Sequence, residues 1–274
     1  MPVPSPLSEP MPLSLRLERQ RAGVLRRLAE CRVPGIEQGH AVAAVVALEM
    51  ATVADLLAAC DLEALVPELP GASPRRRRAF LAGRLCAEMA LREASGASAH
   101  VARHADGDPV WPAGWCGAIA HGEHLAIAAV TSRSRANGLG IDVERCVDAS
   151  ARAAVEQVCS TPAERRAIAA SAAPEPFATL VFSAKESYYK AVFPTIRAFV
   201  DFHEVELAEV DWRERRFLVR PTSARGSGGA ALPSLRGTFQ WLGADLVTQV
   251  SDPAAPHGID AGRQVHGAAA AATT

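Results

Sequence analysis

The chain has 274 residues and a formal net charge of −1, with 49% hydrophobic and 22% charged residues. These values are typical of a globular protein with enough length for a sizeable core. They exclude a chain that is basic as a whole, so the overall charge gives no reason to expect a nucleic-acid partner.

The six cysteines lie far apart and form no C-x-x-C pair, which favours reduced, mostly buried thiols in a cytoplasmic protein. The start of the chain lacks a basic segment followed by an apolar one, so no signal peptide is expected. No run reaches the roughly 18 to 20 apolar residues of a membrane span. The sequence therefore predicts a soluble, intracellular protein with no membrane partner.

In chain order, a Pro- and Ser-rich start is expected to be disordered, and Leu13 to Arg32 then fit a helix. The apolar run HAVAAVVALEM, which begins at His40, is typical of a buried strand.

After the turn cluster LPGASP, the segment RRRRAFLAGRLCAEMALREASG predicts a long helix. Leu81, Leu85 and Met89 recur every four residues, and Gly96 supplies a stop. The stretch DGDPVWPAG, at 106–114, is expected to form a loop because it contains several helix and strand breakers.

LAIAAVT, from Leu125, predicts another buried strand, followed by a loop at 131–137. The next segment, GLGIDVERC, alternates with the period of a strand. One face then carries Leu139, Ile141 and Val143, and the other carries Gly140, Asp142 and Glu144.

Ala-rich helical stretches follow, then a helix around Lys185, the strands EVELAEV and RRFLVRP, a Gly/Ser-rich loop at 223–229 and a closing hairpin, GTFQWLGADLVTQV. The chain ends in a low-complexity tail. Helices and strands are mixed without strict β-α-β alternation, which indicates the α+β class.

The alternation in GLGIDVERC places the carboxylates of Asp142 and Glu144 side by side. Two such charges repel unless a cation lies between them, and a magnesium ion suits this role when phosphates complete its shell. A lone D-x-E is also typical of the wet polar face of a strand end, so both interpretations stay open at this point.

The stretch FSAKESYYKAV holds both lysines of the chain, Lys185 and Lys190, whereas every other basic residue is arginine. An apolar stripe of Val181, Ala184, Tyr188, Ala191 and Val192 gives this segment a core-facing helix face.

A surface pair between Glu186 and Lys190, worth about 0.2–0.5 kcal/mol, explains only part of this pattern. It leaves unexplained why both lysines are here. Two mobile cations beside a carboxylate also suit a phosphate-plus-metal site, with the cations on phosphate oxygens and the glutamate on the metal or acting as a base.

GIDVE followed some forty residues later by FSAKESYYK resembles the paired signature of the 4′-phosphopantetheinyl transferases. The basic cluster running into RAFLAGR, the loop GDPVWPAG and the segment GAIAHGEHLAIAAV are similar to the branch that includes the enterobactin synthase component D proteins. The resemblance covers about Val45 to Val250 and leaves both tails outside.

The resemblance implies transfer of the 4′-phosphopantetheine arm from coenzyme A to a serine of an acyl or peptidyl carrier protein, with release of adenosine 3′,5′-bisphosphate. The carrier would belong to fatty-acid, polyketide or nonribosomal-peptide synthesis, and a siderophore pathway is an association of the branch. The implied fold has two similar α/β halves, related by a pseudo-twofold, with coenzyme A in the cleft between them.

That division gives four predicted parts: an N-terminal extension, partly disordered, at 1–37; a first half at 38–135; a second half at 136–250; and a disordered tail at 251–274. The single-chain architecture predicts a monomer.

The resemblance also assigns residues by motif position. Asp142, Glu144 and Glu186 would bind Mg²⁺, with Glu186 as third ligand or as the base toward the carrier serine. Lys185 and Lys190 would contact phosphate oxygens and take part in catalysis. Arg76, Arg84, His121 and the same two lysines would hold coenzyme A.

Alternatives remain for the supporting residues. Arg77 lies seven residues from Arg84, on the same helix face, and therefore competes with Arg76 for the site. Four positive charges at 75–78 oppose the helix dipole, which favours an anionic partner over a solvated helix start. His121 and His124 have H-x-x-H spacing, but no third His or Cys ligand is nearby in sequence.

Two departures from the family pattern stand out. Asp106 and Asp108 occupy the neighbourhood where many relatives carry a lysine, and Ala118 stands where a serine is common. We expect activity with an altered affinity for coenzyme A.

Three rival functions stay open. One is a magnesium-dependent phosphohydrolase with water as nucleophile, and another is a degenerate relative that binds coenzyme A or a carrier protein as a scaffold. The third is a nucleic-acid-binding module built on 75–78, which lacks interleaved aromatics and a basic overall balance.

Overall fold

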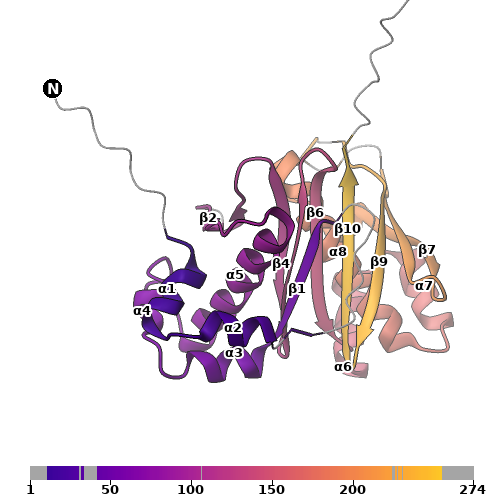
Figure 1. The fold of residues 1–274 in the computed structure, drawn as a ribbon. Coiled ribbons are helices and arrows are strands. Elements are labelled where there is room, and N and C mark those ends of the chain that lie inside the picture. The colour runs from indigo at the N-terminus through magenta and orange to yellow at the C-terminus, as the bar shows by residue number, and fades with distance from the viewer. Residues whose placement is uncertain are drawn as a thin grey trace, which may run out of the picture.

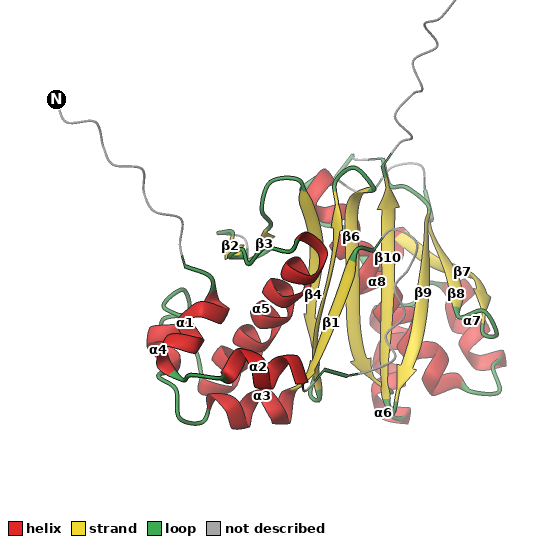
Figure 2. Ribbon diagram, in the orientation of Figure 1, coloured by secondary structure: helices red, strands yellow, loops and turns green. Residues whose placement is uncertain are grey.

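The computed structural model describes residues 11–30, 32–33, 42–105, 107–223, 226, 228–229 and 231–254. Within these residues the chain forms two halves, each built on an antiparallel sheet with one long helix packed against it (Figures 1 and 2). Mixed helices and strands in two sheet-bearing halves confirm the predicted α+β class.

The helices of the first half are α1 (Leu13–Gln20), α2 (Val24–Glu30), α3 (Met50–Leu57), α4 (Leu62–Leu65) and α5 (Pro74–Ser95). Its strands are β1 (Ala44–Glu49), β2 (Ala102–Arg103), β3 (Pro109–Val110), β4 (Trp115–His121) and β5 (Leu125–Ser132). The main sheet has the order β1-β5-β4, and β2 pairs with β3 beside it.

The helices of the second half are α6 (Ala149–Val158), α7 (Pro162–Ala170), α8 (Pro174–Ile196) and the 3-10 helix η1 (Phe202–Glu204). Its strands are β6 (Ala136–Arg145), β7 (Val205–Asp211), β8 (Arg216–Pro221), β9 (Leu235–Leu242) and β10 (Asp245–Pro253). They form one sheet in the order β6-β10-β9-β8-β7.

The predicted long helix and the predicted closing hairpin are both confirmed. Helix α5 begins at a Ser73 cap followed by Pro74, and it ends at Gly96, whose φ of 75° is the left-handed conformation that glycine adopts readily. Strands β9 and β10 pair across a turn at Gly243.

Several predicted boundaries were wrong. The helix expected over Leu13 to Arg32 is split by Gly23, whose φ is 81°, into α1 and α2. Strand β4 was not predicted, because its sequence, WCGAIAH, contains small residues without clear alternation. The loop expected at 131–137 is shorter, since β5 extends to Ser132 and β6 starts at Ala136.

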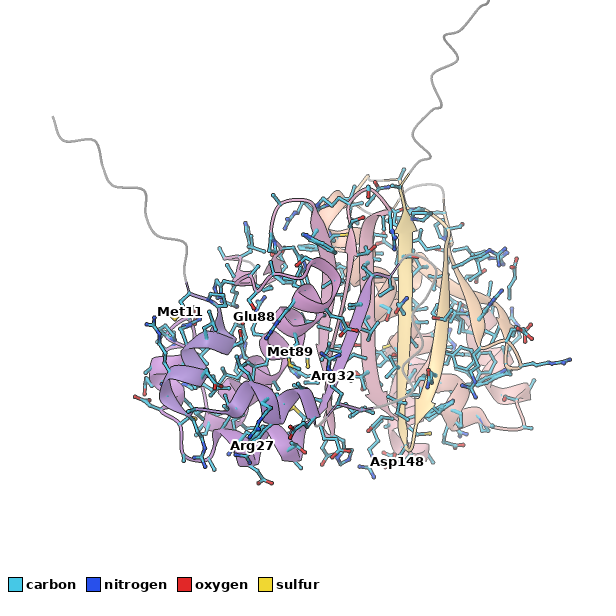
Figure 3. All side chains as sticks on the ribbon, in the orientation of Figure 1. Met11, Arg27, Arg32, Glu88, Met89 and Asp148 are labelled. Carbon is cyan, nitrogen blue, oxygen red and sulfur yellow. The ribbon has the colours of Figure 1, made fainter. Side chains whose placement is uncertain are left out.

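The N-terminal helices belong to the core of the first half, as Leu13, Leu17, Val24 and Leu28 are buried there. Glu88, labelled in Figure 3, projects from α5 and accepts hydrogen bonds from the backbone N–H groups of Leu13 and Ser14 at 2.6 and 2.7 Å. The carboxylate thus satisfies two donors at the start of α1 that have no intrahelical partner.

The predicted division into parts stays a prediction, with details that differ from it. Residues 13–30, assigned to a partly disordered extension, form packed helices, and β10 continues past residue 250 to Pro253. The remainder of the predicted tail, 255–274, lies outside the described residues, as do Cys31, His40 and Asp106.

The alternation predicted for GLGIDVERC holds, but both faces of β6 are covered. Leu139, Ile141 and Val143 pack against apolar side chains of β4 and β5, which joins the two halves. The opposite face meets α8, so the acidic face is not the wet strand end that the alternative interpretation required.

Glycine allows α8 to approach β6 closely. A Cβ at Gly140 would stand 1.7 Å from the backbone oxygen of Ser187, and one at Gly138 would stand 1.9 Å from that of Ala191. Backbone contact of this kind seats the lysine-bearing helix directly over the strand that carries Asp142 and Glu144.

The five cysteines of the described chain are free thiols, three of them buried, in agreement with the prediction of reduced cysteines. Among the helices of the described residues, none has both the length and the apolar character needed to cross a membrane.

Candidate active site

Asp142 lies on β6 under α8 and is 4% exposed. Its Oδ1 accepts a hydrogen bond from Lys190 Nζ at 2.7 Å, and its Oδ2 accepts one from Ser183 Oγ at 2.9 Å. Both donors come from α8, so the helix engages both oxygens of this buried carboxylate.

Glu144 and Glu186 share the surroundings of Asp142. Burial, and then the negative charge of Asp142, raises the pKa of Glu144 to about 7, while Lys190 lowers it. Burial also raises the pKa of Glu186, with a further rise from Asp142 against an opposing effect of Lys190. We call Asp142, Glu144, Glu186 and Lys190 the carboxylate–lysine cluster.

Lys190 is the cation of this cluster. It is four residues from Glu186 on α8, and its side chain remains 27% exposed while its ammonium pairs with Asp142. One ammonium faces three carboxylates, so the cluster carries an excess of negative charge that a further cation would relieve.

The donor set suits magnesium, because carboxylate oxygens are the ligands this ion prefers. The positions of these side chains do not form a complete metal site, because across the described residues no three His, Cys, Asp or Glu side chains converge closely enough to hold a metal ion. Lys190 already engages Oδ1 of Asp142. The chemistry of the donors therefore fits Mg²⁺, and the positive charge of Lys190 offsets part of their negative charge.

Lys185 differs from its prediction. Its side chain is 1% exposed, and Nζ donates to Glu164 Oε2 at 2.7 Å and to the backbone oxygens of Cys159 and Phe202 at 2.8 and 2.7 Å. An ammonium has three donors, and all of them are used. Lys185 therefore does not reach a phosphate in this structure, and it ties α8 to α7 and η1.

Glu164, the partner of Lys185, was missed by the sequence interpretation. It is 3% exposed, closes a capping box with Thr161 at the start of α7, and accepts a hydrogen bond from Leu207 N at 2.6 Å. The T-P-x-E pattern is typical of a capping box, and that is the only signal of Glu164 in the sequence. Its pairing with a lysine in another helix depends on the tertiary fold.

A cavity of about 1690 Å³ lies against the N-terminal part of α5 and reaches the second half at the β9–β10 turn. Side chains from both halves line it, and five of them are arginines: Arg75, Arg76, Arg78, Arg84 and Arg103. We call it the arginine cavity. The sequence did not predict the contribution of Arg103, which comes from the short strand β2.

Arg84 is the buried arginine of this cavity, 5% exposed, with its guanidinium over the ring of Phe80 at 4.9 Å. Its Nη1 has no hydrogen-bond partner among the described residues. Burial lowers the pKa of the guanidinium to about 10, which still leaves it charged at neutral pH. A buried charge without a full set of partners is costly, and an anion in the cavity would supply the missing contact.

The structure separates Arg76 from its competitor. Arg76 lines the cavity, whereas the Arg77 guanidinium points elsewhere and pairs with Glu63 at 3.0 Å. Adjacent residues on a helix point in different directions, which is why only one of the two faces the cavity. The structure thus places both Arg76 and Arg84 on the cavity wall.

His121, at the end of β4, also lines the cavity. Burial of its ring lowers its pKa, the positive charges of Lys190 and Arg76 lower it further, and Asp142 raises it. His121 therefore lies on the cavity wall, and charges of the carboxylate–lysine cluster also affect the pKa of its ring. His124 also lines the cavity, and it lies near Glu123 and contacts Arg145.

The departures from the family pattern have structural partners. Asp108 pairs with Arg197 at 3.0 Å and with His104 at 3.5 Å. Ala118 is buried where the two halves meet. Trp111, from the same loop, packs against Gly117, where a Cβ would stand 2.8 Å from the indole ring.

Comparisons with known proteins agree with this picture. A model of the 4′-phosphopantetheinyl transferase N-terminal domain matches residues 63–131, and a model of the 4′-phosphopantetheinyl transferase superfamily matches residues 138–228. The first match covers α5 and the cavity side of the first half. The second covers the carboxylate–lysine cluster.

Curated relatives show the same similarity. The chain is 34% identical to 4′-phosphopantetheinyl transferase Svp of Streptomyces mobaraensis over 191 residues, which are 68% of this chain and 76% of that protein. It is 32% identical to 4′-phosphopantetheinyl transferase Npt of Nocardia iowensis over 133 residues, 48% of this chain and 59% of that protein. It is 39% identical to enterobactin synthase component D of Salmonella typhi over 124 residues, 45% of this chain and 51% of that protein. The last two alignments span less than two thirds of the relatives' lengths.

Proposed function

The chain belongs to the 4′-phosphopantetheinyl transferase superfamily, and on that premise we propose that it moves the 4′-phosphopantetheine arm of coenzyme A onto a serine of an acyl or peptidyl carrier protein. The observation that carries the proposal is the continuity of the site. Gly122, next to His121, lines the arginine cavity, and a Cβ there would stand 3.4 Å from the backbone oxygen of Val143. Val143 lies between Asp142 and Glu144 on β6, so the cavity wall adjoins the strand of the carboxylate–lysine cluster.

The arginine cavity suits the nucleotide end of coenzyme A. Its volume of about 1690 Å³ exceeds that of pockets for small ligands, roughly 300–1,000 Å³, so it has room for an extended one. Arg76, Arg84 and His121 would meet phosphate oxygens. The buried and incompletely paired Arg84 gives the strongest attraction.

Asp142 and Glu144 would hold Mg²⁺ against the pyrophosphate of coenzyme A, and Glu186 would either complete the metal site or serve as the base. The ion would act there as a Lewis acid that draws charge from the phosphate oxygens. Lys190, whose side chain is 27% exposed, would contact a phosphate oxygen in place of its present contact with Asp142.

In the reaction, the carrier serine oxygen forms a bond to the phosphorus that bears the pantetheine arm. The bond from that phosphorus to the bridging oxygen breaks, and its electron pair leaves with adenosine 3′,5′-bisphosphate. The serine proton needs an acceptor. Glu186 fits this role because its pKa is raised, and raised basicity at neutral pH favours a general base.

The role first assigned to Lys185 is revised in this proposal. Its ammonium holds α7 and η1 against α8, one residue from Glu186. Lys185 would thus position Glu186 rather than contact the substrate. We also propose that the protein is cytoplasmic and monomeric and that it has no nucleic-acid or membrane partner.

A scaffold that binds coenzyme A or a carrier protein without chemistry is the second candidate. Asp106, which lies outside the described residues, and Asp108, which pairs with Arg197, favour it, since they stand where many relatives carry a lysine. A phosphohydrolase would use the same carboxylates with water as nucleophile.

Intact-mass spectrometry separates these functions. Apo carrier proteins are incubated with the full chain, coenzyme A and Mg²⁺, and the expected result is a mass gain of one phosphopantetheine arm that EDTA abolishes. Glu186→Gln should abolish the gain, whereas Glu175→Gln, the same change on the same helix at a residue paired with Arg152, should preserve it. Coenzyme A that binds without transfer supports the scaffold, and coenzyme A cleaved without a carrier supports the hydrolase.

A further inference from the structure

Three buried hydroxyl groups form a line behind Asp142. Ser183 Oγ lies 2.9 Å from Asp142 Oδ2, Thr248 Oγ1 lies 2.8 Å from Ser183 Oγ, and Ser187 Oγ lies 2.6 Å from Thr248 Oγ1. All three hydroxyl residues are 0% exposed. The line is closed to solvent and ends on one oxygen of the carboxylate.

The three hydroxyl groups and Asp142 come from three elements, α8, β10 and β6, so their alignment is a property of the fold. Thr248 on β10 is the direct cross-strand partner of Asp142 on β6. Side chains of directly paired residues share a face of the sheet, and this face is the one that α8 covers. Ser183 and Ser187 are one helical turn apart on α8 and reach down to that face.

The direction of the hydrogen bonds is fixed at the Asp142 end. An ionised carboxylate accepts and never donates, so the single proton of Ser183 must point at Asp142 Oδ2. Ser183 Oγ can then accept from Thr248, and Thr248 Oγ1 can accept from Ser187. Backbone oxygens offer alternative acceptors, Ser183 O for Thr248 at 2.9 Å and Thr248 O for Ser187 at 3.0 Å, and neither alters the bond to Asp142.

Small apolar side chains would fill the same space. Burying hydroxyl groups instead costs free energy, and their hydrogen bonds must offset that cost. The line leads to a single charged group, and that group belongs to the carboxylate–lysine cluster. The bond from Ser183 occupies Oδ2, and Oδ1 accepts a hydrogen bond from Lys190 Nζ at 2.7 Å.

We propose that Ser183 is a positioning residue for Asp142, supported by Thr248 and Ser187, and that it locks Oδ2 so that Oδ1 alone is presented for cation binding. This inference rests on the proposed function, because it assigns Asp142 to the magnesium site. Partners behind a ligand typically change metal affinity by roughly 10- to 100-fold when they are removed.

The test is calorimetric titration of Mg²⁺ into the full chain with saturating coenzyme A and no carrier protein, so that no turnover occurs. Ser183→Ala should weaken Mg²⁺ binding by roughly 10-fold or more, with coenzyme A affinity in EDTA unchanged. Ser183→Thr, which keeps a hydroxyl, should restore Mg²⁺ binding. Thr248→Val, which keeps the shape and removes the middle hydroxyl, should cause a smaller loss and serves as the second test if Ser183→Ala does not fold.

The matched control is Ser160→Ala, at an equally buried serine whose hydroxyl donates to the Val155 carbonyl on α6. It should leave Mg²⁺ affinity unchanged. In the transfer assay, Ser183→Ala should raise the KM for Mg²⁺ and leave the KM for coenzyme A as it is.

The outcomes distinguish the inference from its premise. An active wild-type enzyme whose Mg²⁺ affinity is the same in Ser183→Ala and Thr248→Val overturns the positioning role and leaves the proposed function intact. A wild-type chain that neither binds Mg²⁺ nor transfers the arm overturns both.

Discussion

In the carboxylate–lysine cluster the cation already has a protein partner, whereas in the arginine cavity the buried Arg84 keeps one nitrogen without a partner among the described residues. The cluster lies where α8 packs on β6, and the cavity is lined by residues of both halves. The difference indicates two tasks. In the cluster, Lys190 already pairs with Asp142. In the cavity, a bound anion would supply the partner that Arg84 Nη1 lacks among the described residues.

The largest expected effect separates the two lysines of α8. Lys185→Met would leave Glu164 buried without its cation, which typically costs about 3–5 kcal/mol of the free energy of unfolding. Lys190→Met should cost far less stability, because its ammonium is partly exposed, and should instead impair transfer. Urea denaturation followed by circular dichroism measures both variants.

The double variant Lys185→Met with Glu164→Leu provides the control, since it removes both charges. It should recover part of the lost stability. If Lys185→Met unfolds at the same urea concentration as the wild type, the buried pair does not hold α7 to α8.

The second prediction concerns the contact that seats α8 on β6. Gly140→Ala adds a methyl group 1.7 Å from the Ser187 backbone oxygen, so helix and strand must separate. Such overpacking costs about 1–3 kcal/mol or more and would also displace Asp142 from Ser183 and Lys190. Thermal unfolding measures the loss, with Gly71→Asn as control, because Gly71 has a left-handed φ of 72° that asparagine tolerates and open space around it. Equal melting temperatures for Gly140→Ala and the wild type would contradict the close contact.

The third prediction concerns the positive charge of Arg84 in the arginine cavity. Arg84→Met removes a charge-assisted contact worth about 1.5–3 kcal/mol and should weaken coenzyme A binding by roughly 10- to 150-fold. Protein stability should stay the same or rise, because a buried charge disappears. Arg77→Met, which breaks only the surface pair with Glu63, should leave binding unchanged in the same calorimetric titration. A binding loss in Arg77→Met of the same size as in Arg84→Met would refute the assignment.

The smallest effect is a pH dependence of binding. The pKa of His121 in the folded chain lies below its ordinary value of 6.5, so the unfolded chain binds this proton more readily. The contribution of His121 to stability is therefore present above about pH 6.5 and is lost as the pH falls from there through the folded pKa. A bound phosphate would favour protonation, so coenzyme A affinity should rise a few-fold as the pH falls through this window.

His121→Gln should flatten that rise, whereas His203→Gln, at an exposed histidine that pairs with Asp201 and does not line the cavity, should keep it. Calorimetry at several pH values, with NMR titration of the imidazole in the free protein, provides the measurement. A rise of the same size in His121→Gln would assign the proton to another group.

Local periodicity predicted much of the fold and the acidic face of β6. The alternation of GLGIDVERC and the apolar stripe of α8 place Ile141 and Tyr188 in the core, because each pattern depends only on the geometry of its own element. The short loop and the extra strand β4 escaped prediction, since small residues give weak signals.

The sequence did not predict which charged side chains turn inward. Lys185 and Lys190 lie in one motif, yet one reaches Glu164 in α7 and the other reaches Asp142 on β6. Arg103 enters the cavity only because the short pair β2–β3 folds back beside α5. Such partners are distant in sequence, and only packing decides them.

The central claim is that the cavity binds coenzyme A while the cluster performs the transfer. The most direct measurement compares Arg84→Met and Glu186→Gln in two assays, coenzyme A titration in EDTA and intact-mass transfer to an apo carrier protein with Mg²⁺. The account predicts that Arg84→Met loses binding, and that Glu186→Gln binds coenzyme A normally yet transfers nothing. Transfer at the wild-type rate by Glu186→Gln would contradict it.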